Sequence, residues 1–114
     1  AEDESKSLSI AGIWSTWKGE SGVQIQSAAI ITREAVDELA TIHSRMPVFM
    51  PEDRWDIWLD SKNREIETLI PLMDIPNPAA GLVTRPVASK VNLVANNGAE
   101  LIQAIELGEA QTLF

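Results

Sequence analysis

The stretch TIHSRMPVFM, from Thr41 to Met50, joins the chain's single histidine to an apolar run, and its interpretation decides the fold. His43 and Arg45 lie where a helix is expected to give way to a strand. In an extended segment, residues separated by one position project to the same side, so these two side chains are expected to lie together. The apolar residues Met46 to Met50 then predict a short strand.

The segments that precede this stretch predict a β-hairpin followed by a helix. Residues 8–17 are rich in Ile and Trp and predict a mostly buried strand, and residues 18–22 contain two glycines that predict a turn. Residues 23–31 begin with strict apolar and polar alternation, which predicts the second strand. Thr32 is then suited to cap a helix that carries Glu34 in its first turn and ends near residues 41–42.

The segments that follow the stretch predict short helices and strands in an irregular order. Helices are predicted over residues 51–60, where Trp55 and Trp58 share one face, and over residues 63–70, ending at Pro71. Beyond a loop at 74–81, the patterns predict strands at 82–88 and 90–95, a turn at 96–98 and a closing helix at 99–107. This order favours the α+β class over a doubly wound parallel sheet.

The composition predicts one soluble globular domain. The chain has 114 residues, 45% of them hydrophobic and 23% charged, and no apolar run approaches the ~20 residues that span a bilayer. Residues 1–7 are polar and predict a flexible terminus or linker, with the domain over residues 8–114. The start of the chain carries no recognisable signal peptide. A net charge of −8 weighs against a free-standing nucleic-acid binder, because phosphate contacts need clustered Lys and Arg.

The residues that could carry chemistry each allow two interpretations. His43 is either a partly buried histidine at a helix end or a general acid or base. Arg45 either forms a surface ion pair with Glu52 or Asp53 or clamps a phosphate, since a guanidinium grips phosphate in a two-pronged geometry. The four tryptophans could stack on bases, but their apolar periodicity favours core packing. The chain has no cysteine, and a lone histidine makes no convincing metal site.

Four blocks of the sequence, in order, resemble the SRAP domain, the family of SOS response-associated peptidases. The blocks are AGIW (Ala11 to Trp14), AAIITREA (Ala28 to Ala35), IHSRMPVFMPEDRWDIWLD (Ile42 to Asp60) and RPVASKVNLVANNGAELIQAI (Arg85 to Ile105). The IHSRMPV block is specific to the family, and the resemblance covers about residues 10–106. It implies an α+β fold with a mixed or antiparallel β-sheet, forming an SRAP-like partial barrel with short flanking helices.

The resemblance also implies a role in the response to DNA damage. Members of the family recognise abasic sites in single-stranded DNA and join to them covalently through an N-terminal cysteine. Its amino group and thiol condense with the opened sugar aldehyde to give a thiazolidine. By this resemblance His43 matches the active-site histidine and Arg45 matches the arginine that contacts DNA. No cofactor, metal or membrane is implied, and the expected location is cytoplasmic, associated with the nucleoid of a bacterium or phage host.

This chain departs from the family pattern, because the cysteine and the family's first half, with its asparagine and glutamate, are absent from the sequence. Two explanations follow. Either the chain is the C-terminal part of a longer SRAP protein, whose first half is its partner, or it is a truncated relative that acts in protein–protein interaction. Self-association is a further expectation, because a partial domain exposes strand edges and apolar surface. Whether the chain alone is an enzyme stays open.

Overall fold

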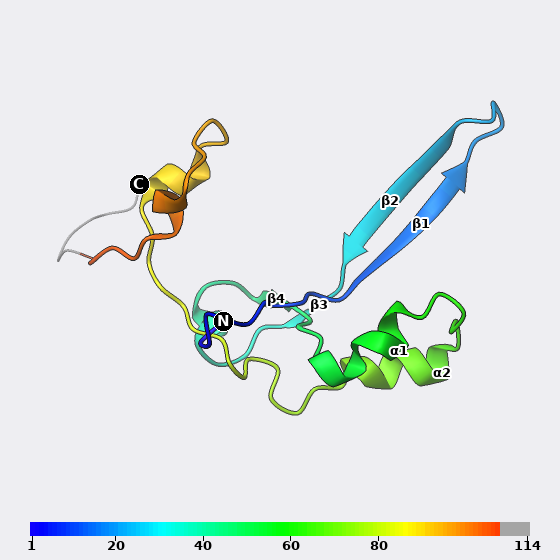
Figure 1. Ribbon diagram of the computed structural model, residues 1–114, viewed down its shortest axis with the longest axis horizontal. Coiled ribbons are helices and arrows are strands. Elements are labelled where there is room, and N and C mark those ends of the chain that lie inside the picture. Colours follow the sequence, from blue (N-terminus) through cyan, green and yellow to red (C-terminus); the bar gives the residue numbers. More distant parts are fainter. Residues whose placement is uncertain (108–114) are drawn as a thin grey trace. The chain divides into compact units, whose positions relative to one another are not determined.

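The structure of the chain, a computed structural model, describes residues 1–107 (Figure 1). Backbone contacts divide the chain into two compact units, one ending at Leu82 and the other beginning at Val83. The units are described separately below. The prediction that one domain extends over residues 8–114 reaches beyond the described part of the chain at its C-terminal end.

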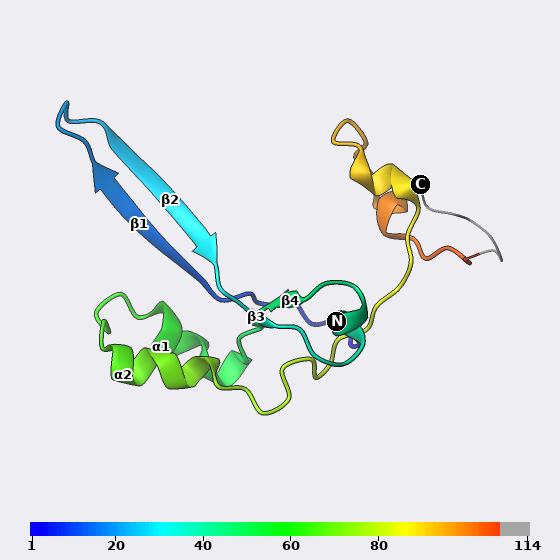
Figure 2. The same ribbon diagram turned by 180° about the vertical axis from the view of Figure 1, so that it is seen from behind.

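The first unit confirms the α+β class, with two antiparallel two-stranded sheets and short helices. Its elements are strands β1 (Gly12–Lys18), β2 (Gln24–Ile30), β3 (Thr32–Glu34) and β4 (Arg45–Pro47), helices α1 (Trp55–Leu59) and α2 (Ile66–Leu69), and the 3₁₀ helices η1 (Asp37–Thr41), η2 (Glu52–Arg54) and η3 (Ile70–Met73). Within residues 1–107 the strands do not close into a barrel. Figure 2 shows from behind how β3 follows β2 at the base of the hairpin.

Three backbone segments meet at the centre of this unit in a ring of hydrogen bonds. The N–H of Ala11 donates to the carbonyl oxygen of Val48 at 2.8 Å, that of Val48 donates to Ile31 at 2.9 Å, and that of Ile31 donates to Ala11 at 3.0 Å. Each residue therefore both donates and accepts. Ala11 and Val48 are 1% and 3% exposed, so this ring satisfies backbone groups that water cannot reach.

The core of the unit forms around this ring. Ala11, Val48 and Met50 are buried together, and Trp55 and Trp58 pack against them as partly buried side chains. The indole N–H of Trp55 donates to the carbonyl oxygen of Met50 at 2.8 Å, and that of Trp58 donates to Gly12 at 3.3 Å. Both hydrogen bonds hold α1 over the ring, which confirms core packing for these two tryptophans.

The hairpin β1–β2 is confirmed as predicted from its turn. Gly12 pairs with Ile30, and Lys18 pairs with Gln24. A hydrogen bond closes the turn, in which the N–H of Gly19 donates to the carbonyl oxygen of Val23 at 2.9 Å. Gly22 has φ +83°, a conformation that favours glycine. The expectation of a mostly buried strand and of core packing for Trp14 and Trp17 is wrong, because both indoles are exposed in a ribbon that no other layer of the first unit covers.

The predicted helix over residues 32–42 is also wrong in its first half. Thr32 lies in β3, where it pairs with Pro47, and helical structure begins at Asp37 as a single 3₁₀ turn without a side-chain cap. The reason is that Ile30, Ile31 and Thr32 are β-branched, and such residues favour a strand once a partner is available. That partner is β4, the strand expected within Met46 to Met50, which begins one residue earlier and ends at Pro47.

The two helices expected after Met50 are confirmed in shorter form, as η2 with α1 and as α2 with η3. Helical structure passes Pro71, where the prediction ended it, because Pro71 occupies the first turn of η3, a position that needs no N–H donor. Arg54 joins the two helical segments, since its Nη1 donates to the carbonyl oxygens of Leu72 and Asp74 at 2.7 and 3.0 Å.

The second unit contains the 3₁₀ helices η4 (Ser89–Asn92) and η5 (Ala99–Ile102) and one antiparallel bridge between Val87 and Ala104. The strands predicted at 82–88 and 90–95 do not form, and the closing helix is reduced to η5. Pro86 cannot donate to a ladder, and residues 88–96 close successive tight turns instead, such as the N–H of Asn96 on the carbonyl oxygen of Leu93 at 2.9 Å.

Truncation of Met50 tests the position of the core. Met50 is 5% exposed, so Met50→Ala is expected to lower the free energy of unfolding by roughly 2–5 kcal/mol in urea denaturation. The control is Leu59→Ala in α1, where the side chain is 75% exposed and the expected change is within about 0.5 kcal/mol. Equal losses in the two variants would contradict this core.

Candidate functional site

His43 lies in a closed loop between β3 and β4. The N–H of Ala35 donates to the carbonyl oxygen of Ser44 at 2.9 Å, which joins the two ends of the loop. Within it, the N–H groups of Ile42 and His43 donate to the carbonyl oxygen of Leu39 at 3.0 and 3.1 Å. These hydrogen bonds place His43 two residues after the end of η1 and two residues before β4.

The imidazole of His43 is exposed and folds back on the backbone of Arg45. Its Nδ1 lies 2.9 Å from the backbone nitrogen of Arg45 and 3.1 Å from the carbonyl oxygen of the same residue. In the neutral ring with Nδ1 unprotonated, the Arg45 N–H donates to Nδ1 and the ring proton is on Nε2. The alternative of a partly buried core histidine is wrong, because the loop holds the side chain at the surface.

The guanidinium of Arg45 is held by Thr32 across the small sheet. Its Nη2 lies 2.8 Å from the carbonyl oxygen of Thr32 and 3.1 Å from Oγ1, and its Nε lies 3.4 Å from Oγ1. The two residues are diagonal neighbours on one face of the β3–β4 pair, where Glu34 is directly opposite Arg45. The guanidinium donates to Thr32 and not to Glu52 or Asp53, so the predicted surface ion pair is wrong.

Thr32 is the site residue that sequence reasoning missed. The sequence predicts a helix cap at Thr32, whereas its hydroxyl and carbonyl oxygen orient Arg45. The β-branched run Ile30, Ile31 and Thr32 was the available signal, because it favours a strand that continues across residue 32. The structure thus joins the Arg45 guanidinium to Thr32 and the His43 imidazole to the Arg45 backbone, and all three residues are exposed.

Asp37 adopts a backbone conformation that few residues prefer, with φ +52° at the start of η1. Its neighbour Val36 is extended, so the backbone conformation changes sharply between these two residues. Aspartate tolerates this left-handed region better than most residues with a side chain. The conformation of Asp37 therefore shapes the loop that presents His43.

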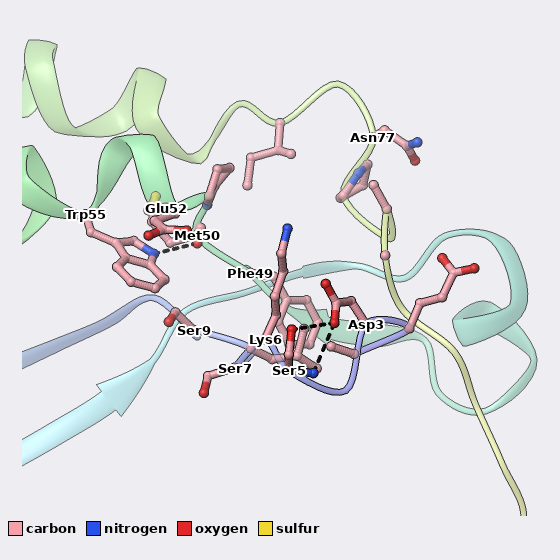
Figure 3. Close-up of a pocket in the computed structure, with 18 of the residues that line it drawn as sticks. Asp3, Ser5, Lys6, Ser7, Ser9, Phe49, Met50, Glu52, Trp55 and Asn77 are labelled. Atoms are coloured by element: carbon pink, nitrogen blue, oxygen red, sulfur yellow. Dashed lines mark hydrogen bonds between the residues drawn. The ribbon is translucent and has the colours of Figure 1, made fainter.

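An open groove of about 1020 Å³ lies elsewhere in the first unit (Figure 3). Residues 1–3 and 5–9 form one wall, and Phe49, Met50, Trp55 and residues 75–78, 80 and 81 supply other lining groups. A hydrogen bond joins this N-terminal wall to the segment opposite, because the N–H of Glu2 donates to the carbonyl oxygen of Gly81 at 2.7 Å. His43 and Arg45 do not line this groove, so the groove and the His43 edge are separate features of the unit.

The N-terminal wall of the groove contains a small polar turn at Asp3. The hydroxyl of Ser5 donates to Oδ1 of Asp3 at 2.6 Å, and the Ser5 N–H donates to the same oxygen at 3.0 Å. These two hydrogen bonds, the side-chain one above all, lower the pKa of the Asp3 carboxyl, because they stabilise its charged form.

Within residues 1–107, no three His, Cys, Asp or Glu side chains gather as a metal site would require. In the same part of the chain, no helix has the length and apolar character needed to cross a membrane.

Comparison with known proteins assigns the chain to a family. The profile described as "SOS response associated peptidase (SRAP)" matches residues 1–94, which include the β1–β2 hairpin, the β3–β4 sheet and the His43 loop. The chain belongs to the SRAP family. The resemblance expected from the sequence blocks is thereby confirmed.

The curated SRAP relatives are longer than this chain. It is 34% identical over 97 residues to the abasic site processing protein YoaM of Bacillus subtilis. This match covers 85% of the chain and 42% of YoaM. It is 31% identical over 97 residues to the abasic site processing protein YoqW of the same organism, covering 85% and 43% of the two chains. It is also 34% identical over 106 residues to the abasic site processing protein HMCES of Gallus gallus, covering 89% and 30%. The chain therefore spans less than half the length of each of these relatives. No solved structure matches it.

Substitution of Asp37 tests the loop conformation. Asp37→Gly is expected to keep or slightly raise stability, because glycine adopts positive φ freely, whereas Asp37→Val is expected to cost about 1–2 kcal/mol. Urea denaturation of the two variants measures the difference, and amide chemical shifts at Ser44 and Arg45 report whether the loop changes. If valine were tolerated as well as glycine, the left-handed conformation of Asp37 would be excluded.

Proposed function

We propose that this chain supplies part of an SRAP site that processes abasic sites in single-stranded DNA. In this proposal the complete domain forms a covalent crosslink to the DNA through an N-terminal cysteine that this chain does not contain. The proposal is carried by one observation: the three relatives described above are all abasic site processing proteins, and the match to them includes the His43 loop. The geometry around His43 and Arg45 supports it.

The proposed chemistry forms two bonds at one carbon atom. The amino group and the thiol of the cysteine both add to the aldehyde carbon of the opened sugar, and the aldehyde oxygen leaves as water. Nucleophilic attack and loss of water each need proton transfer, which a positioned imidazole can provide. A single cysteine suits this reaction because it supplies both nucleophiles.

The backbone of Arg45 offers His43 a partner in each protonation state. While the ring is neutral, Nδ1 accepts from the Arg45 N–H at 2.9 Å, and Nε2 makes no hydrogen bond within residues 1–107. When the ring is doubly protonated, Nδ1 can no longer accept from this N–H, and the ring has to turn towards the Arg45 carbonyl oxygen, 3.1 Å away, to which Nδ1 can then donate. The small size of this turn suits Nε2 to gain and lose a proton in the same part of the site.

Arg45 is suited to hold a phosphate next to that imidazole. Thr32 takes up Nε and Nη2 of the guanidinium, while Nη1 makes no hydrogen bond to any described residue. The side chain is therefore oriented but keeps donor capacity for an anion. Because the chain carries a net charge of −8, most of the positive surface that DNA binding needs would have to come from the rest of the domain.

The test uses a chimera in which this chain replaces the 97 residues of YoaM that match it. The chimera is incubated with a single-stranded oligonucleotide that carries one abasic site, and crosslinked product is measured on denaturing gels. We expect a crosslink, and we expect His43→Gln to slow its formation about 100-fold or more. Ser44→Ala is the matched control in the same loop and should react at the parent rate.

A second readout separates DNA binding from chemistry. Arg45→Gln should weaken binding and make the plot of log affinity against log salt shallower by about 0.7, as expected when one phosphate contact to a single strand is lost. Absence of any crosslink in a folded chimera would refute the enzymatic proposal and favour a role in protein–protein interaction instead. An undiminished rate in His43→Gln would refute proton transfer by His43.

A further inference from the structure

The β1–β2 hairpin has two chemically different faces. Because side chains alternate along a strand, Ile13, Trp17, Ile25 and Ala29 share one face with two central serines, Ser15 and Ser27. This set is called the apolar hairpin face below. The opposite face carries Trp14 together with the polar side chains Thr16, Lys18, Gln24 and Gln26, and with Ala28 and Ile30. The two tryptophans of β1 thus lie on opposite faces of the same strand.

The apolar hairpin face is exposed within the first unit. Trp17 is 60% exposed, Ile13 and Ile25 are exposed to a similar degree, and no residue of β2 is even partly buried. An isolated two-stranded ribbon is marginally stable in water, and it normally packs its apolar face on another layer. The first unit does not supply that layer.

The comparisons indicate what that layer is. The SRAP profile covers residues 1–94, so the hairpin lies inside the family domain and is not an appendage to it. More than half of YoaM and of YoqW lies outside the region that matches this chain. We propose that the apolar hairpin face docks against the part of the SRAP domain that lies outside these 114 residues, which presents an apolar surface with hydrogen-bonding groups opposite Ser15 and Ser27. This inference rests on family membership and is independent of the proposed crosslinking chemistry.

The experiment compares one substitution in two settings, the 114-residue chain alone and the YoaM chimera. In the chimera Trp17 would be covered, so Trp17→Ser is expected to lower the urea midpoint by about 1 M or more. In the chain alone, where Trp17 is exposed, the same substitution should change the midpoint little. Trp14→Ser, on the other face of β1, is the matched control and should have a small effect in both settings.

Several results would overturn the proposal. One is a Trp17→Ser shift that is no larger in the chimera than in the chain alone, and another is a chimera that shows no cooperative unfolding. Should Trp17→Ser prevent folding altogether, Ile25→Ala should still give a smaller decrease in the urea midpoint, and only in the chimera.

A dimer of the 114-residue chain in sedimentation, abolished by Trp17→Ser but not by Trp14→Ser, would assign the apolar hairpin face to a second copy. A chimera that shows the Trp17 shift but traps no abasic DNA would refute the proposed function and leave the docking intact.

Discussion

The first unit depends on the ring of backbone hydrogen bonds that joins Ala11, Ile31 and Val48. Each of these residues donates to one partner and accepts from the other, with nitrogen to oxygen distances of 2.8 to 3.0 Å. A buried backbone group without a partner costs about as much as a lost hydrogen bond, so three segments distant in sequence must meet together or not at all. This constraint explains how a chain with few buried side chains holds a defined centre.

The ring also sets the position of the candidate site. With Val48 in the ring, the side chains of Met46, Val48 and Met50 all lie buried, and the alternation along the strand leaves Arg45 on the outer side. A slip of one residue would bury the guanidinium and expose the methionines, which makes the register strongly specified. The backbone of Arg45 in turn holds the imidazole of His43, so the core determines the geometry of the site.

Much of the first unit could be predicted from its sequence, and the errors have identifiable causes. The hairpin was predictable because its turn contains glycines and its second strand alternates, which are local signals. The helix over residues 32–42 was wrong because the pairing of Thr32 with Pro47 is a tertiary contact that local spacing does not reveal. The burial predicted for Trp14 and Trp17 assumed a covering layer, and the first unit supplies none. The His43 ring contacts the backbone of Arg45 and not its side chain, so the spacing of the two residues does not predict this contact. The contact with Thr32 depends on β3, which the sequence patterns do not predict.

Amide hydrogen exchange, resolved by NMR, tests the central role of the ring most directly. The account predicts that the amides of Ala11, Ile31 and Val48 exchange at similar rates and are the slowest in residues 1–82, because all three open when the centre opens. Amides along β1–β2 should exchange faster, since that ribbon is exposed on both faces. Faster exchange at the three ring amides than along the hairpin, or three widely different rates within the ring, would contradict the account.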